Sequence, residues 1–175
     1  MQFFEPARLL EYIHDFIIFD GGVKKAARPN QYFAVKAAQP RVRKKQNGII
    51  WHSQGSGKSL TMVWLAQWIR ENVSEARVVI ITDRDELDKQ IESGFKDAGE
   101  QIQRAKSGGK LIEMLNAAEP WLICTLIHKF GNKNDGDAIS VGNKKANKSL
   151  DVYLEELAKS LPADFRSKGN IYVFI

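Results

Sequence analysis

Hydrophobic positions along this 175-residue chain follow two alternating patterns. Compact runs of apolar and β-branched residues predict buried strands at 48–52, 77–82, 121–125 and 170–175. Apolar positions at helical spacing predict helices at 58–72, over most of 83–95, from about Ser107, and around 149–160. Strands that alternate with helices in this way are typical of an α/β fold, in which helices cover both faces of a parallel sheet.

The beginning of the chain has a separate, mainly helical pattern. Residues 6–19 space their apolar side chains as an amphipathic helix, and Gly21-Gly22 is expected to end it. Asn30 is expected to cap the start of a second helix, which Pro40 is expected to kink or end. We therefore divide the chain into a helical lead-in at 1–47 and an α/β unit at 48–175.

Composition excludes several classes of protein. Hydrophobic residues make up 43% and charged residues 27%, which is typical of a globular domain, and no apolar run approaches the ~20 residues that span a membrane. The single cysteine, Cys124, lies in an apolar run and is expected in the core, so the chain has no internal disulfide and fits a reducing cytoplasm. The net charge of +5 favours a polyanionic partner. Gly, Asn, Lys and Asp are concentrated at 131–148, where we expect a long mobile loop.

The segment 51–59, with the sequence WHSQGSGKS, carries the most specific chemistry. It stands between a predicted strand and a predicted helix, as the phosphate loop of a nucleoside triphosphate site does. Gly55 and Gly57 allow the backbone to curl with its N–H groups toward phosphate oxygens, and the helix N-terminus adds partial positive charge. Lys58 is placed to reach the β- and γ-phosphates, and the Ser59 hydroxyl to ligate Mg²⁺. The alternative, a chance Gly-Ser linker, does not account for the flanking strand and helix.

This loop and four other segments resemble one family. Residues 51–62 closely resemble the ATP-binding motif of the motor (R) subunit of type I restriction endonucleases, in which His52 stands where other phosphate loops have their first glycine. Residues 28–32 are similar to the family's adenine-reading motif, and residues 79–90 to its next helicase motif. Residues 125–130 are similar to its Thr-Thr-Ile-Gln-Lys-Phe segment, and residues 171–175 to the strand that an Asp-Glu-x-His box follows. Cys124 and His128 depart from the family pattern, which more often has Thr and Gln there. The resemblance extends over residues 9–175.

The resemblance implies a superfamily 2 helicase-like ATPase with a P-loop NTPase, RecA-like fold. Such subunits hydrolyse ATP with Mg²⁺ to translocate double-stranded DNA, which they cleave far from the recognition site, together with methyltransferase and specificity subunits in the prokaryotic cytoplasm. By this comparison the chain is part of the first motor lobe, incomplete at its C-terminus because it stops before the Walker B acid, and it lacks the nuclease domain and second lobe. We therefore expect weak nucleotide binding and negligible hydrolysis by the chain alone.

The resemblance also assigns roles to individual residues. The nucleotide site that it implies consists of Gln31, Gln54, Gly55, Ser56, Gly57, Lys58 and Ser59. In this site Lys58 is the catalytic phosphate ligand, Ser59 is the metal ligand, and the Gln31 amide offers the donor and acceptor that match the adenine edge. The nucleic-acid contacts that it implies are Arg84, Thr125, His128 and Lys129.

Simpler structural roles remain open for several of these residues. Gln31 is alternatively an exposed glutamine at a helix start. The family places Asp83 and Arg84 toward DNA or an interdomain contact, but Asp83 is alternatively a helix cap. His128 is alternatively a plain surface residue. The basic cluster Arg41, Arg43, Lys44 and Lys45 is alternatively a solvated face rather than a DNA contact. Trp64 and Trp68, four residues apart, are expected to pack against the sheet rather than stack on bases.

Three functions are therefore compatible with the sequence. The first is the ATP-binding part of a type I restriction motor. The second is a fragment of another superfamily 2 helicase or of a chromatin-remodeller-like ATPase, against which the His-Ser-Gln-Gly preface at 52–55 argues. The third is a remnant or binding module without catalysis that uses its basic surface on nucleic acid, which the missing Walker B acid favours for this chain taken alone.

Overall fold

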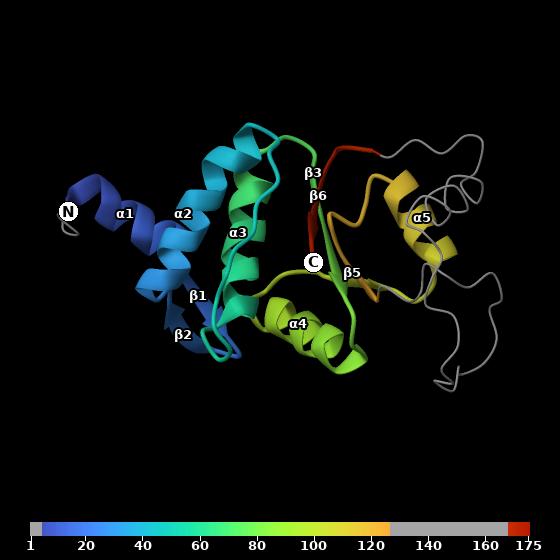
Figure 1. Ribbon diagram of the computed structural model, residues 1–175, viewed down its shortest axis with the longest axis horizontal. Helices are drawn as coiled ribbons and strands as arrows, with labels where there is room; N and C mark the ends of the chain where they lie inside the picture. Colours follow the sequence, from blue (N-terminus) through green and yellow to red (C-terminus); the bar gives the residue numbers. More distant parts are fainter. Residues whose placement is uncertain (1–4, 127–167) are drawn as a thin grey trace.

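The structure is a computed structural model that describes residues 5–126 and 168–175 (Figure 1). Its helices are α1 (Pro6–Asp15), α2 (Pro29–Arg43), α3 (Lys58–Asn72), α4 (Asp85–Asp97) and α5 (Gly108–Asn116). Its strands are β1 (Ile17–Asp20), β2 (Val23–Ala26), β3 (Ala76–Thr82), β4 (Gln103–Ala105), β5 (Leu122–Leu126) and β6 (Asn170–Phe174). No helix among these residues is long and apolar enough to cross a membrane.

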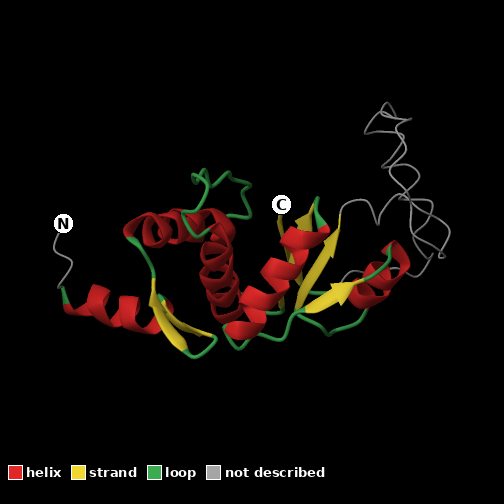
Figure 2. Ribbon diagram, turned by 90° about the horizontal axis from the view of Figure 1, so that it is seen from below, coloured by secondary structure: helices red, strands yellow, loops and turns green. Residues whose placement is uncertain are grey.

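Four strands form one parallel sheet in the order β4-β5-β3-β6. Successive side chains of a strand point to opposite faces, and the two faces of this sheet have separate cores. Val78 and Ile80 of β3 belong to the core that includes residues of α3 and α4, whereas Val79 belongs to the core that includes Leu111 and Met114 of α5. Helices therefore cover both faces of the sheet, as predicted (Figure 2).

Several predicted elements are confirmed nearly to the residue. The helix predicted at 58–72 is α3, and the strands predicted at 77–82, 121–125 and 170–175 are β3, β5 and β6. Ser107 caps α5, because its Oγ accepts a hydrogen bond from the Lys110 N–H at 3.2 Å. Trp64, Trp68 and Cys124 are buried in the core on the α3 side of the sheet. The loop expected at 131–148 and the helix expected at 149–160 lie outside the described residues.

The lead-in contains a β-hairpin where the sequence predicted a continuous helix over 6–19. α1 ends at Asp15, and β1 then pairs antiparallel with β2. Gly21 and Gly22 form the turn with positive φ angles of 58° and 81°, as a two-residue hairpin loop of this kind requires. The Gly-Gly pair was therefore wrongly assigned as the end of a helix, because it is the turn of a hairpin.

α2 begins earlier than predicted and continues past Pro40, where the sequence predicted a kink or an end. Arg28 is its N-cap and Pro29 its first residue, so the assignment of Asn30 as the cap is wrong. Pro40 does not end the helix, which continues to Arg43. Proline cannot donate a backbone hydrogen bond, but the ladder resumes after it, because the Lys44 N–H donates to the Pro40 carbonyl oxygen at 3.2 Å.

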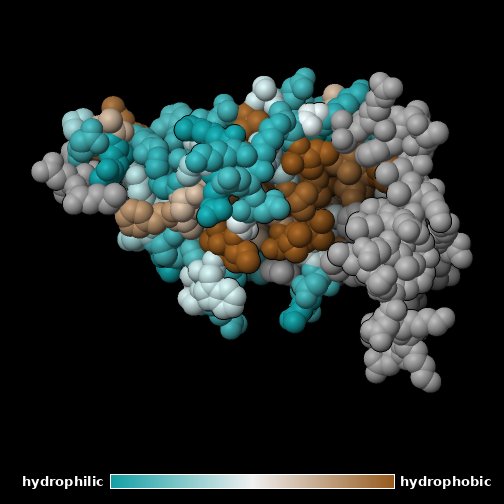
Figure 3. Space-filling view, turned by 45° about the horizontal axis from the view of Figure 1, so that its top comes forward, coloured by the Kyte–Doolittle hydropathy of each residue, from teal (hydrophilic) through white to brown (hydrophobic). Residues whose placement is uncertain are grey.

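The strand predicted at 48–52 is absent from the described structure, and this prediction was wrong. Ile49 and Trp51 are each 90% exposed. Val173 of β6 and Ile175, which follows β6, are also exposed apolar residues. On the face shown in Figure 3, hydrophobic side chains gather over the middle of the molecule. A strand needs a neighbouring strand to complete its backbone hydrogen bonds, so an apolar run alone does not ensure one.

Candidate nucleotide-binding site

The loop before α3 has the backbone geometry that its glycines predicted. Gly57 is the N-cap of α3 and has φ 83° and ψ 39°, and Gly55 has φ 75°. Both angles lie in the left-handed region that side chains with a Cβ rarely adopt. Between the two glycines, Ser56 turns the chain, because its Oγ donates to the Ser53 carbonyl oxygen at 2.7 Å. The loop therefore closes on itself directly in front of the helix.

The start of α3 supplies positive charge and unsatisfied donors. The first backbone N–H groups of a helix have no partner within it, and the helix dipole adds partial positive charge there. Lys58 and Ser59 are the first two residues of α3. The Lys58 Nζ donates to the carbonyl oxygens of Ser53, at 3.0 Å, and His52, at 3.5 Å. The lysine ammonium and the helix terminus thus face the same short loop. Gln54 lies in this loop and is exposed.

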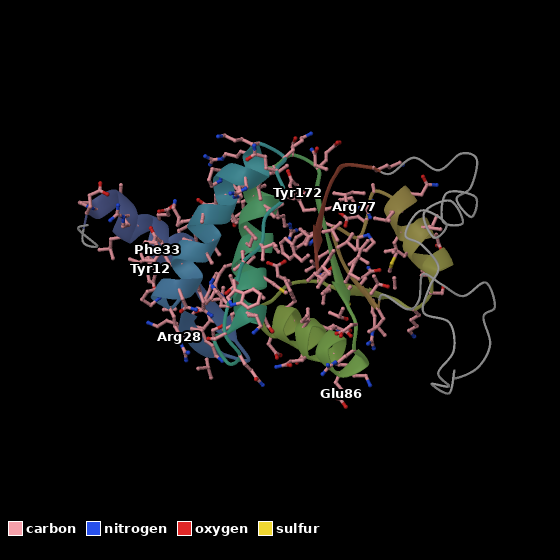
Figure 4. All side chains as sticks on the ribbon, viewed as in Figure 1. Tyr12, Arg28, Phe33, Arg77, Glu86 and Tyr172 are labelled. Carbon is pink, nitrogen blue, oxygen red and sulfur yellow. The ribbon has the colours of Figure 1, made fainter. Side chains whose placement is uncertain are left out.

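Gln31 joins the start of α2 to this loop. Its side chain is only 3% exposed, so the alternative of an exposed glutamine at a helix start is wrong. Its Oε1 accepts a hydrogen bond from the Arg28 N–H at 2.8 Å, and its Nε2 donates to the Gly57 carbonyl oxygen at 3.0 Å. Figure 4 shows Arg28 at this end of α2. The amide that was predicted to read adenine is therefore engaged by backbone on both sides, and base reading itself stays a prediction.

The residues predicted to contact nucleic acid do not form one described cluster. Arg84 is the N-cap of α4, 80% exposed and ion-paired at 3.6 Å with Asp83, so Asp83 is not the helix cap. Thr125 is 1% exposed, and its hydroxyl donates to the Ala105 carbonyl oxygen at 3.4 Å. That burial directs Thr125 to the neighbouring strand β4 rather than to solvent. His128 and Lys129 lie outside the described residues.

The basic cluster at the end of α2 is exposed at all four positions, as a solvated face would be, although some of its side chains have protein partners. Arg43 lies over the Trp68 ring, 5.2 Å from its centroid. Arg41 donates to the Asn47 carbonyl oxygen at 3.3 Å, and Lys45 donates to Asn170 Oδ1 at 3.4 Å. Three of the four side chains therefore have protein partners, which leaves a DNA contact by this cluster as an untested prediction.

The geometry fits an anion with several phosphate oxygens. It combines a left-handed glycine loop, a helix N-terminus and a lysine, all within a few residues. These are the elements that bind phosphate in nucleotide-binding proteins. The links from α2 to the loop were outside the reach of local patterns, since 26 residues separate Gln31 from Gly57. The resemblance assigned Gln31 to the nucleotide site, but Asn30 was expected only as a helix cap, and its contact with the loop, in which Nδ2 donates to the Ser56 carbonyl oxygen at 3.5 Å, was not predicted.

One family model and several known proteins are similar to this chain in sequence. The sequence model of the SWI2/SNF2 ATPase family matches residues 30–167. The putative type I restriction enzyme MjaIXP endonuclease subunit of Methanocaldococcus jannaschii is 34% identical over 146 residues, which cover 77% of this chain and 14% of the relative. The type I restriction enzyme SauCOLORF180P endonuclease subunit of Staphylococcus aureus is 31% identical over 84% of this chain and 16% of the relative. The type I restriction enzyme HindI endonuclease subunit of Haemophilus influenzae is 27% identical over 82% and 15%. The chain thus spans a small part of the length of these relatives.

Proposed function

The chain belongs to the SWI2/SNF2 ATPase family, and from this premise we propose that it is the ATP-binding part of the DNA-translocating motor subunit of a type I restriction system. The observation that carries the proposal is the loop that ends at Gly57, with the Lys58 ammonium folded over it and α3 starting behind it. The similarity to type I restriction endonuclease subunits selects this motor among helicase-like ATPases.

ATP with Mg²⁺ is the proposed ligand of this site. The backbone N–H groups of Gly55, Ser56 and Gly57 and the helix terminus would surround the phosphates, with Lys58 on the β- and γ-phosphates. The Ser59 hydroxyl would ligate Mg²⁺, which neutralises phosphate charge when bound. Gln54 would line the same loop. The matched segment spans 14% of the Methanocaldococcus jannaschii relative, and we propose that hydrolysis requires a whole motor subunit of that kind.

Double-stranded DNA and the other restriction subunits are the proposed partners. The net charge of +5 suits a polyanion, and Arg84 is an exposed cation at the carboxyl end of β3. We propose methyltransferase and specificity subunits as the protein partners, in the prokaryotic cytoplasm, because the relatives carry the names of type I restriction enzymes. The division into a lead-in at 1–47 and a motor part at 48–175 also stays a proposal.

A titration of the purified chain with ATP, ADP and AMP tests the nucleotide site. Because the proposed contacts are made to phosphates, we expect affinity to fall from ATP to ADP and to be lost for AMP when each is followed calorimetrically with Mg²⁺. Equal affinity for all three, or no binding of ATP, would contradict the proposal. Binding of duplex DNA without any nucleotide binding would instead support the alternative of a nucleic-acid-binding module.

A further inference from the structure

Two successive side chains of α2 hold two successive carbonyl groups of the phosphate loop. The Gln31 Nε2 donates to the Gly57 carbonyl oxygen at 3.0 Å, and the Asn30 Nδ2 donates to the Ser56 carbonyl oxygen at 3.5 Å. The Gly57 carbonyl oxygen also accepts hydrogen bonds from the N–H and the hydroxyl of Thr61, at 3.2 and 3.3 Å. The last peptide groups of the loop are therefore fixed from the α2 side and from within α3.

Holding these carbonyls also directs the N–H groups that follow them. A trans peptide unit is planar, and its C=O and N–H groups point in opposite directions. The carbonyls of Ser56 and Gly57 point toward the donors on α2 and α3, so the N–H groups of Gly57 and Lys58 point the other way. The Lys58 N–H belongs to the first turn of α3, where N–H groups lack helical partners. These N–H groups are the ones that a phosphate group would meet.

The side-chain amide of Gln31 is hydrogen-bonded at both ends, to the phosphate loop and to the start of α2. Its Oε1 accepts from the Arg28 N–H at 2.8 Å, and the side chain is 3% exposed. The fit is close, since a Cβ added to Gly57 would overlap Gln31 Nε2. Each end of the amide has one hydrogen bond to backbone, and the burial of the residue leaves little of the remaining N–H and lone pair accessible to a base.

We propose that Gln31 and Asn30 are positioning residues that orient the phosphate loop for a polyphosphate, whatever base that polyphosphate carries. This role rests on the proposed function, because it concerns the same nucleotide site. It differs from adenine reading in one measurable respect. A loop-positioning residue affects every ligand with a triphosphate equally, whereas an adenine-reading residue affects only adenine nucleotides.

The test is a calorimetric titration of the chain, with Mg²⁺, against ATP, GTP and inorganic tripolyphosphate. We expect Gln31→Ala to weaken all three by the same factor, about 5- to 10-fold, as the loss of one hydrogen bond at a loop predicts. We expect Asn30→Ala to produce a smaller loss that is again equal for the three ligands, since its contact is longer. Asn30 is exposed, so this variant keeps the test valid even if Gln31→Ala fails to fold.

Two further variants separate positioning from a general loss of structure. Gln39→Ala truncates another buried glutamine of α2, 6% exposed, whose Nε2 has no hydrogen-bond partner among the described residues, and it should leave the three affinities unchanged. Gln31→Glu keeps an oxygen to accept from the Arg28 N–H, but it places a second oxygen against the Gly57 carbonyl. It should weaken tripolyphosphate binding at least as much as Gln31→Ala does, although the helix cap is preserved.

The outcomes are distinguishable. A Gln31→Ala chain that loses affinity for ATP alone, with tripolyphosphate unaffected, would overturn the positioning role and support adenine reading. Undiminished tripolyphosphate binding by Gln31→Glu would also overturn the positioning role. If the unchanged chain binds none of the three ligands, the proposed nucleotide site itself fails, and the positioning role fails with it.

Discussion

The ammonium nitrogen of Lys58 lies 3.0 Å from the carbonyl oxygen of Ser53, so the lysine folds back over the loop that precedes it. A carbonyl oxygen is a neutral acceptor, and a phosphate oxygen is an anionic one that forms a shorter and stronger hydrogen bond. The lysine is therefore held close to the position where a phosphate would compete for it, and it does not have to be recruited from solvent.

Replacement of Lys58 by alanine is expected to remove most nucleotide affinity. A hydrogen bond to a charged group contributes about 2 kcal/mol, so the dissociation constant for ATP with Mg²⁺ should rise roughly 30-fold or more in a calorimetric titration. Lys110→Ala is the matched control, because Lys110 pairs with Glu113 on α5, across the sheet from α3. Equal ATP affinity in the Lys58→Ala and unchanged chains would refute the phosphate-loop assignment.

Two glycines of the loop should differ in their tolerance of alanine. Both have positive φ angles, 75° at Gly55 and 83° at Gly57, which cost an alanine about 1 to 2 kcal/mol. An added Cβ has open space at Gly55 but overlaps Gln31 at Gly57. Gly57→Ala should therefore lower both the thermal midpoint and ATP affinity more than Gly55→Ala. Equal effects at the two positions would show that the contact with Gln31 is unimportant.

The proposed metal ligand can be isolated from the phosphate contacts. If the Ser59 hydroxyl ligates Mg²⁺, then Ser59→Ala should bind ATP in the presence of EDTA as the unchanged chain does, but should lose the gain in affinity that Mg²⁺ provides. Ser56→Ala is the control, because the Ser56 hydroxyl donates to the Ser53 carbonyl within the loop. A Ser59→Ala chain that retains the full Mg²⁺-dependent gain would exclude Ser59 as the ligand.

Local sequence patterns predicted the elements that depend on their own residues. β3 was identifiable because a run of β-branched residues suits a strand buried on both faces, and six of its seven residues are indeed buried. The start of α5 followed from Ser107, whose hydroxyl accepts the Lys110 N–H. The conformation of the loop before α3 followed from Gly55 and Gly57, since glycine adopts the positive φ angles found there without the steric cost of a Cβ.

Contacts between distant segments were beyond these patterns. Ile49 and Trp51 have strand-forming side chains, but a strand forms only against a neighbour, and both are 90% exposed. The Gly21-Gly22 pair is compatible with a helix end and with a hairpin turn, and only the pairing of β1 with β2 decides between them. Arg77 was placed in a buried strand without a role, because its partners come from other parts of the chain.

Arg77 is expected to be essential for stability. The residue is 3% exposed near the start of β3, and its guanidinium donates to five carbonyl oxygens, those of Met114, Leu115, Ala117, Pro120 and Lys168. Figure 4 shows Arg77 on the side of the sheet toward α5. Arg77→Leu would remove the shared donor of these acceptors, of which the Leu115 carbonyl oxygen keeps the Lys168 N–H at 3.3 Å. The loss should cost about 3 kcal/mol or more in the free energy of urea unfolding.

An exposed arginine provides the comparison for Arg77. Arg70 is 54% exposed, pairs with Glu100 at 3.1 Å and lies 4.6 Å from the centroid of the Trp121 ring. Exposed contacts of these kinds contribute little, so Arg70→Leu should cost no more than about 1 kcal/mol. Similar losses of stability for the two variants would show that the carbonyl contacts of Arg77 do not contribute beyond an ordinary surface pair.

His14 should make stability depend on pH. A hydrogen bond to Asp15 and the charges of Asp15 and Glu71 raise the pKa of His14 above its usual 6.5. A raised pKa in the folded state means that folding favours the protonated ring, so this contribution is fully present below pH 6.5 and is lost as the pH rises through the folded pKa. The ring is 74% exposed, so solvent screens the interaction and keeps the effect small.

A variant that cannot be protonated isolates this contribution. We expect the free energy of unfolding of the unchanged chain, relative to His14→Gln, to be higher at about pH 5.5 than at about pH 8.5. Asp15→Asn should lower the pKa of His14 in an NMR titration, because it removes the largest cause of the shift, and it should reduce this pH dependence. A His14 pKa that is the same in the Asp15→Asn and unchanged chains would contradict the pairing of His14 with Asp15, and the pH dependence would then require another titrating group.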